Sequence, residues 1–215
     1  MDYMLMGRIV PFFFQGACVT LGLATLTFFI SLLIGAVATM CRLSRSIPLR
    51  TAARVYVSIF RGTPCLVQLF IIYFGVSQMG VDLSPFVAAV AGLSLNLGAY
   101  MSESIRGAIF AVDRGQNEAA RSIGFSRSQA MRYVLIPQAA RLMIRSIGIN
   151  AVMLVKTTSI VSAISVVELT YMSQRFIGST FKPFEVFALA ATMYMVIVYL
   201  LSWSVEKLDQ RFALN

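Results

Sequence analysis

The stretch DRGQNEAARSIGFSRSQAMRYVLIPQAARLMIR, residues 113–145, is a charged island between long apolar segments. It predicts two short helices joined by a sharp hinge. The first helix is expected over residues 116–123 and ends at Gly124, because glycine readily takes the left-handed conformation that follows a helix end. Phe125 is then placed to fold back on Ala120. The position of the hinge is therefore defined by local sequence.

The second helix of this stretch is expected to begin at once, because Ser126 precedes Gln129 by three residues. At that spacing a hydroxyl and an amide satisfy each other's free backbone donors in a capping box. Pro137 is expected to stop or kink the helix that follows.

The same stretch resembles the cytoplasmic loop of the membrane-spanning subunits of binding-protein-dependent ABC importers. That loop carries Glu-Ala-Ala, three residues, Gly, nine residues and then Ile-x-Leu-Pro. The matching residues here are Glu118, Ala119, Ala120, Gly124, Val134, Leu135, Ile136 and Pro137. The departures are Val for Ile and Ile for Leu. The resemblance implies that the short helix is a coupling helix seated in a groove of an ATP-hydrolysing subunit. The alternative is an ordinary amphipathic helical hairpin.

The composition predicts an integral membrane protein. Of the 215 residues, 58% are hydrophobic and 13% are charged, which is too apolar for a soluble domain of this size. The net charge of +9 is compatible with a nucleic-acid partner or with orientation in a bilayer. Because the arginines collect in two loops between apolar segments, we expect orientation in a bilayer and no nucleic-acid partner.

The chain has no histidine, so the commonest general base and metal ligand are missing. Its three cysteines, Cys18, Cys41 and Cys65, form no close pair and are interpreted as small buried hydrophobic residues. Neither a disulfide nor a metal site is expected. The apolar run after Arg8 continues to Cys41, so a cleavable signal peptide is not expected either.

We predict an all-α membrane protein with five spans close to residues 16–40, 62–80, 84–102, 147–167 and 187–203. The loop 42–61 carries five arginines and no acidic residue, and the loop 103–145 carries seven arginines. The positive-inside rule places both loops and the carboxyl terminus in the cytoplasm and the amino terminus outside. We expect a single domain over 1–215, with a core of about 16–205 and a coupling loop of about 103–146 between the third and fourth spans.

Two further runs resemble the polar amino acid branch of these importers. The run Arg-Gly-Thr-Pro-x-x-x-Gln is matched by Arg61, Gly62, Thr63, Pro64 and Gln68, and a second run by Asn96, Tyr100, Glu103 and Arg106. The resemblance makes Gln68, Asn96, Tyr100 and Glu103 candidates for the substrate pathway. Interhelical hydrogen bonding and packing remain the alternatives for these side chains.

Lys156 is the only full charge well inside an apolar segment, and intramembrane lysines normally face protein or water. It lies roughly 13 Å from the start of the fourth span, near the bilayer middle, and is a further pathway candidate. The family usually reads Lys-Asp-Thr-Ser or Lys-Asn-Thr-Ser here, but Thr157 replaces the acidic or amide residue. A substrate carboxylate could pair with Lys156 transiently. Alternatively, Glu103 or a backbone carbonyl could pair with Lys156 permanently.

The resemblance covers about residues 11–211. It implies a permease subunit, not an enzyme, that moves a polar or charged amino acid from a periplasmic or extracellular binding protein across the bacterial inner membrane. No Gly-x-x-x-x-Gly-Lys-Ser/Thr motif occurs, so we expect no cofactor in this chain and ATP and magnesium on a dimer of separate ATP-binding subunits. Five helices are few for a pathway, which implies a second permease copy or a related subunit.

An external segment containing Glu168, Arg175, Lys182 and Glu185 is expected to contribute to docking of the soluble receptor. The alternative function is an ion-coupled secondary transporter or channel subunit. Such a protein is expected to have several mid-membrane ionisable residues and often an internal repeat, and the sequence shows neither. The identity of the carried amino acid does not follow from the sequence.

Overall fold

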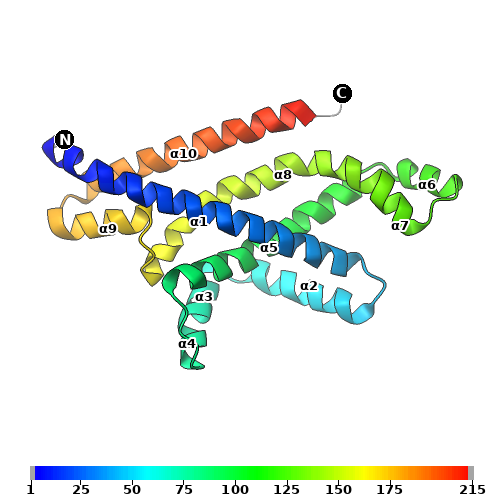
Figure 1. The fold of residues 1–215 in the computed structure, drawn as a ribbon, viewed down its shortest axis with the longest axis horizontal. Helices are drawn as coiled ribbons and strands as arrows, with labels where there is room; N and C mark the ends of the chain where they lie inside the picture. Colours follow the sequence, from blue (N-terminus) through cyan, green and yellow to red (C-terminus); the bar gives the residue numbers. More distant parts are fainter. Residues whose placement is uncertain (1–2, 213–215) are drawn as a thin grey trace.

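The computed structural model describes residues 3–212, and all regular elements in that range are helices (Figure 1). In chain order they are α1 (Tyr3–Leu43), α2 (Ile47–Gly62), α3 (Cys65–Phe70), η1 (Ile71–Gly75), α4 (Val76–Gln78), α5 (Pro85–Ala111), α6 (Arg114–Ser122), α7 (Arg127–Ala130), η2 (Met131–Leu135), α8 (Ile136–Thr157), η3 (Thr158–Ile164), α9 (Leu169–Thr180) and α10 (Pro183–Phe212). The predicted all-helical fold is confirmed for these residues.

Four helices in the described range are long and apolar enough to cross a membrane: residues 7–43, 85–111, 127–164 and 183–212. A fifth span arises only if α2 and the segment α3–η1–α4 are taken together, and these two parts are bent by 109°. Of the predicted span over 62–80, residues 65–78 are helical, but they pass as a membrane span only together with α2, from which the break at the start of the predicted span separates them. Pro64 forces the preceding Thr63 into an extended conformation (φ −126°, ψ 150°), which ends α2.

The other helices run beyond the predicted spans. The helix α1 extends on both sides of 16–40, with Pro11 inside it, and α5 continues past Ser102 to Ala111. The predicted start of the fourth span at 147 lies within a helix that begins at Arg127. Hydropathy identifies only the part of a helix that lies at bilayer depth. Because arginine and glutamate also favour the helical conformation, a helix can continue beyond its apolar part. The predicted loop of 103–146 is thus mostly helical, with short connections around residues 112–113 and 123–126.

Pro137 was predicted to stop or kink the helix, and the first of these alternatives is corrected because the helix does not stop there. It lies near the start of α8, and the helical segment 127–164 passes through it. The π-helical turn η2 ends just before it. Proline lacks an N–H and crowds the preceding turn, and a widened turn is a known way for a helix to absorb such a disturbance.

The core is built around α5, which packs closely against α1. At their crossing, a Cβ atom added to Gly98 would lie 2.7 Å from Ile34 Cγ2, and one added to Gly35 would lie 2.5 Å from Met101 Cβ. Small residues thus allow the close approach expected of membrane helices. Figure 1 shows α6 and α7 at one end of the molecule, α9 and the amino-terminal part of α1 at the other, and α3 and α4 leaving the bundle sideways.

Candidate functional site

The hinge between α6 and α7 has the predicted chemistry. Asp113 caps α6 by accepting a hydrogen bond from the Gly115 N–H at 2.7 Å. After α6, Gly124 has a φ of +90°, and the Phe125 N–H donates to the Ala120 carbonyl at 3.1 Å. These bonds complete the left-handed helix end that was predicted.

The start of α7 is the predicted capping box. The Gln129 N–H donates to the Ser126 hydroxyl at 3.2 Å, and the Ser126 N–H donates to Gln129 Oε1 at 2.8 Å. Both ends of the hinge are therefore held by local hydrogen bonds, which gives the connection one defined geometry.

The Glu-Ala-Ala segment lies on α6 with most of its surface exposed. Glu118 and Ala119 are exposed, whereas Ala120 is only 4% exposed and faces the rest of the chain. Among the described side chains the Glu118 carboxylate has no hydrogen-bond or ion-pair partner. The nearby Ile123 is 74% exposed. The outer surface of α6 thus offers a free carboxylate and an apolar side chain to another molecule.

The start of the long helical segment 127–164 contacts α6 and its hinge. Gln138 Nε2 donates to Gln116 Oε1 at 3.2 Å, and the Phe125 and Tyr133 rings pack edge to face with centroids 6.4 Å apart. These contacts lie on either side of Pro137 in sequence. A displacement of α6 would therefore act directly on a membrane-spanning helix.

Gln68 and Asn96 meet at the break between α2 and α3. Gln68 Nε2 donates to the carbonyls of Phe60 and Thr63, each at 3.0 Å, and to Thr63 Oγ1 at 2.7 Å. Asn96 Nδ2 donates to the Phe60 carbonyl at 3.1 Å and to Gln68 Oε1 at 2.9 Å. The end of a helix leaves carbonyls without intrahelical partners, and these two amides satisfy them.

Glu103 binds three arginines from three helices. Its carboxylate contacts Arg42 at 2.8 Å, Arg61 at 3.3 Å and Arg106 at 2.7 Å. The Arg61 guanidinium also lies over the Tyr100 ring, 5.5 Å from its centroid. The suggested pairing of Glu103 with Lys156 is therefore wrong, and Glu103 joins the ends of α1 and α2 to α5.

A cavity of about 250 Å³ opens between α3, α5 and α8. Asn96 and Tyr100 line it from α5, and Asn150 and Thr157 line it from α8. Asn150 Nδ2 is held by Ser104 Oγ at 2.8 Å. The cavity combines apolar walls with a few polar groups, which is typical of a small-molecule site.

Lys156 is exposed and lines two other cavities, of about 370 Å³ and 590 Å³. Its side chain makes no hydrogen bond or ion pair within residues 3–212. The structure thus leaves Lys156 available, but it does not place it in the cavity that holds Asn96 and Tyr100. No cluster of acidic or cysteine side chains in the described part of the chain is arranged to hold a metal ion.

Glu168 is a buried carboxylate that the sequence interpretation placed in an exposed docking segment, and that interpretation is corrected. It is 0% exposed and caps α9 by accepting from the Tyr171 N–H at 2.9 Å. Thr20 Oγ1 of α1 and Tyr194 Oη of α10 also donate to it, at 3.3 Å and 2.7 Å. Burial raises the pKa of Glu168, and these hydrogen bonds oppose the rise. The sequence contained one signal for this capping role, which is an acidic residue between an apolar run and the start of a helix.

Comparison with known proteins gives consistent matches over nearly the whole chain. A model of the family described as binding-protein-dependent transport system inner membrane component matches residues 31–214. The chain is 35% identical to a probable amino-acid ABC transporter permease protein of Vibrio harveyi over 98% of both chains. It is 34% identical to the glutamine transport system permease protein of Escherichia coli, over 94% of this chain and 93% of that protein.

The fold also matches a solved structure described as an amino acid ABC transporter with histidines. The TM-score is 0.95 and the sequence identity is 36%, over 98% of this chain and 99% of that chain.

Proposed function

The chain belongs to the family of binding-protein-dependent transport system inner membrane components and is a permease subunit of an amino acid ABC importer; from this premise we propose how it is coupled, oriented and used. We propose that it receives a polar or charged amino acid from a soluble binding protein and releases it into the cytoplasm of a bacterium, across the inner membrane. We also propose that the whole chain forms one transmembrane domain, paired with a second permease copy or a related permease.

The coupling surface in this proposal is α6, with Glu118, Ala119 and Ala120 at its centre. The free carboxylate of Glu118 on an exposed helix carries the proposal, because such a group is ready for a basic partner on another subunit. Gly124 sets the angle at which α7 follows α6. The segment containing Pro137 conveys movement of α6 to α8. The partner is a dimer of ATP-binding subunits, which hold ATP and magnesium.

The pathway in this proposal passes the cavity between α3, α5 and α8. Tyr100 and Thr157 offer hydroxyl groups to it, while Gln68 and Asn96 hold the helix break that shapes its wall. Lys156 lies outside this cavity, on α8 beside Thr157, with an available ammonium group. An α-carboxylate moving along α8 would be attracted to it.

The proposed orientation places the amino terminus outside and α6 and α7 in the cytoplasm. The support is the basic charge of the chain, which collects around the ends of α1, α2 and α6 to α8. Glu103 neutralises only part of it, because one carboxylate faces three arginines.

The coupling assignment is tested in the reconstituted complex with its ATP-binding subunit and binding protein. Glu118→Lys should reverse the charge on α6, and Gly124→Leu should strain the left-handed hinge by about 1–2 kcal/mol. Both variants should insert normally but lose substrate-stimulated ATP hydrolysis and uptake. The wild type and Gly107→Leu are the controls, because Gly107 is exposed and has no described atom near its added Cβ.

If the Glu118 and Gly124 variants transport as well as their controls with the ATP-binding subunit still attached, α6 is not the coupling surface.

A further inference from the structure

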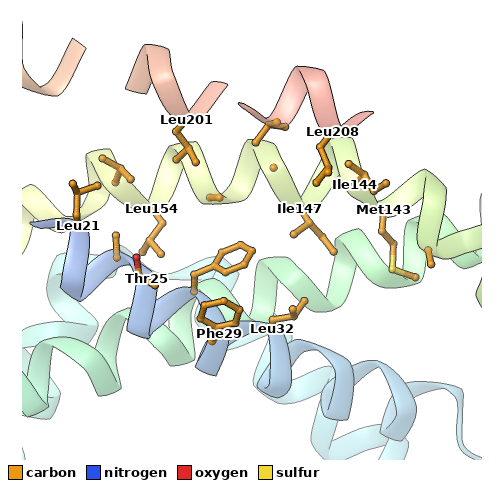
Figure 2. Close-up of a pocket in the computed structure, with 17 residues that line it drawn as sticks. Leu21, Thr25, Phe29, Leu32, Met143, Ile144, Ile147, Leu154, Leu201 and Leu208 are labelled. Atoms are coloured by element: carbon orange, nitrogen blue, oxygen red, sulfur yellow. The ribbon is translucent and has the colours of Figure 1, made fainter. Parts of the chain in front are cut away.

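A deep apolar crevice of about 630 Å³ lies between α1, α8 and α10. Figure 2 shows Leu21, Phe29 and Leu32 of α1 facing Ile147 of α8, with Leu201 of α10 beyond it. Among the described residues that line it, only Thr25 carries a side-chain oxygen or nitrogen. All three helices are candidate membrane spans, so the crevice lies at bilayer depth and suits an apolar occupant.

The crevice is at least as long as one bilayer leaflet is thick. Leu21 and Leu32 mark its extent along α1, and eleven residues of helix rise roughly 17 Å. Half of the hydrocarbon core is about 15 Å thick.

A second cavity, of about 830 Å³, continues this crevice toward the end of the molecule that carries α6 and α7. The two cavities share Leu32 and Met143, so they form one groove along α1. Arg45, Arg127 and Arg132 line the second cavity, and its described lining contains no acidic residue. The groove therefore changes from apolar to strongly basic along its length.

These three arginines have no acidic partner within the described chain. The side chains of Arg45 and Arg127 make no hydrogen bond or ion pair there, and the Arg132 guanidinium only lies over the Tyr133 ring, 5.7 Å from its centroid. By contrast, the nearby arginines of α1, α2 and α5 share the Glu103 carboxylate. Three uncompensated guanidinium groups beside an apolar cavity favour an anion, and guanidinium binds phosphate well.

We propose that this groove binds an anionic phospholipid, with an acyl chain in the crevice and the phosphate at Arg45, Arg127 and Arg132. Basic pockets between membrane helices on the cytoplasmic side bind anionic head groups. The leaflet assignment rests on the proposed orientation, but the site itself does not. A free phosphate would leave the crevice unfilled.

The crevice adjoins the proposed pathway cavity on α8, because Leu154 lines both of them. The three arginines of the groove do not line the pathway cavity. The head-group part of the proposed lipid site is thus separate from the proposed pathway, whereas the apolar crevice lies next to it.

Native mass spectrometry of the purified full-length chain tests the proposal. The protein is incubated with equal amounts of phosphatidylglycerol and phosphatidylcholine that carry identical acyl chains. The wild type should retain phosphatidylglycerol preferentially. Each arginine near an anionic head group contributes roughly fivefold, so the triple variant Arg45→Gln, Arg127→Gln, Arg132→Gln should reduce the preference on the order of 100-fold.

The matched control is the triple variant Arg54→Gln, Arg114→Gln, Arg141→Gln. It removes the same charge from exposed arginines that do not line the groove, and it should keep the preference. Ala151→Phe, which places a ring in the crevice, should weaken retention of both lipids. Circular dichroism of each variant checks that the helices are intact.

Equal retention of the two lipids by the wild type would overturn the proposal. So would an equal loss of preference in both triple variants, which indicates attraction by net charge alone. Binding of inorganic phosphate by the wild type, without retention of either lipid, would also overturn the proposal. The readout needs neither ATP nor transport, so failure here is distinct from failure of the transport assignment.

Discussion

The crossing of α1 and α5 depends on Gly35, and Gly35→Ala should destabilise the protein relative to a matched substitution. The added Cβ would lie 2.5 Å from Met101 Cβ, 3.0 Å from the Ser102 nitrogen and 3.1 Å from the Gly98 oxygen. Non-bonded carbon atoms prefer about 3.5–4.0 Å. Two of the three atoms belong to the α5 backbone, so no side-chain rotation can relieve the contact and the helices must separate.

Gly22→Ala is the control, because Gly22 lies on the same helix, is exposed and has no atom near its added Cβ. Both substitutions gain up to about 1 kcal/mol of helix propensity. Only Gly35→Ala also incurs the overpacking cost of about 1–3 kcal/mol. The difference in free energy of unfolding between the two variants is therefore about 1–3 kcal/mol.

Thermal unfolding of the two purified variants in the same detergent measures this difference. For a chain of this length each kcal/mol shifts the melting temperature by about 2–4 °C, so Gly35→Ala should melt about 2–12 °C below Gly22→Ala. Equal melting temperatures would refute the reasoning, because they would mean that α1 and α5 do not approach closely at Gly35.

Burial raises the pKa of Glu168, so the folded state holds the proton of this carboxyl group more tightly than the unfolded chain does. The free energy of unfolding should therefore fall as the pH rises from the pKa of the unfolded chain, about 4.3, toward the raised pKa of the folded state. Glu168→Gln should abolish that slope in melting temperature from pH 4 to 8, and an unchanged slope would assign it to other groups. Lys156→Met should preserve assembly and basal ATP hydrolysis while reducing uptake in vesicles; a lower melting temperature with unchanged uptake would instead make Lys156 structural. Single cysteines at Ser128 and Ser179, in a background without native cysteines, should label from outside only at Ser179, and external labelling at Ser128 would reverse the proposed orientation.

Local sequence alone determined the membrane class and the chemistry of the hinge. The left-handed Gly124 and the Ser126–Gln129 capping box depend on residues within one helical turn, so their spacing is enough to predict them. The resemblance carried by the same stretch led to the family that the comparisons show. Hydropathy identified apolar segments but not helix ends, because helices continue beyond the bilayer.

Tertiary structure decided how the polar residues are used. The bend of 109° after α2 could not be measured from Pro64 alone, since its direction depends on what the next segment packs against. Glu103 meets Arg42 from a position 61 residues later in the chain, and Glu168 meets Thr20 from 148 residues later. Such pairs form only when helices far apart in sequence are brought together. No local pattern could therefore distinguish an exposed carboxylate at a docking surface from a buried one that joins three helices.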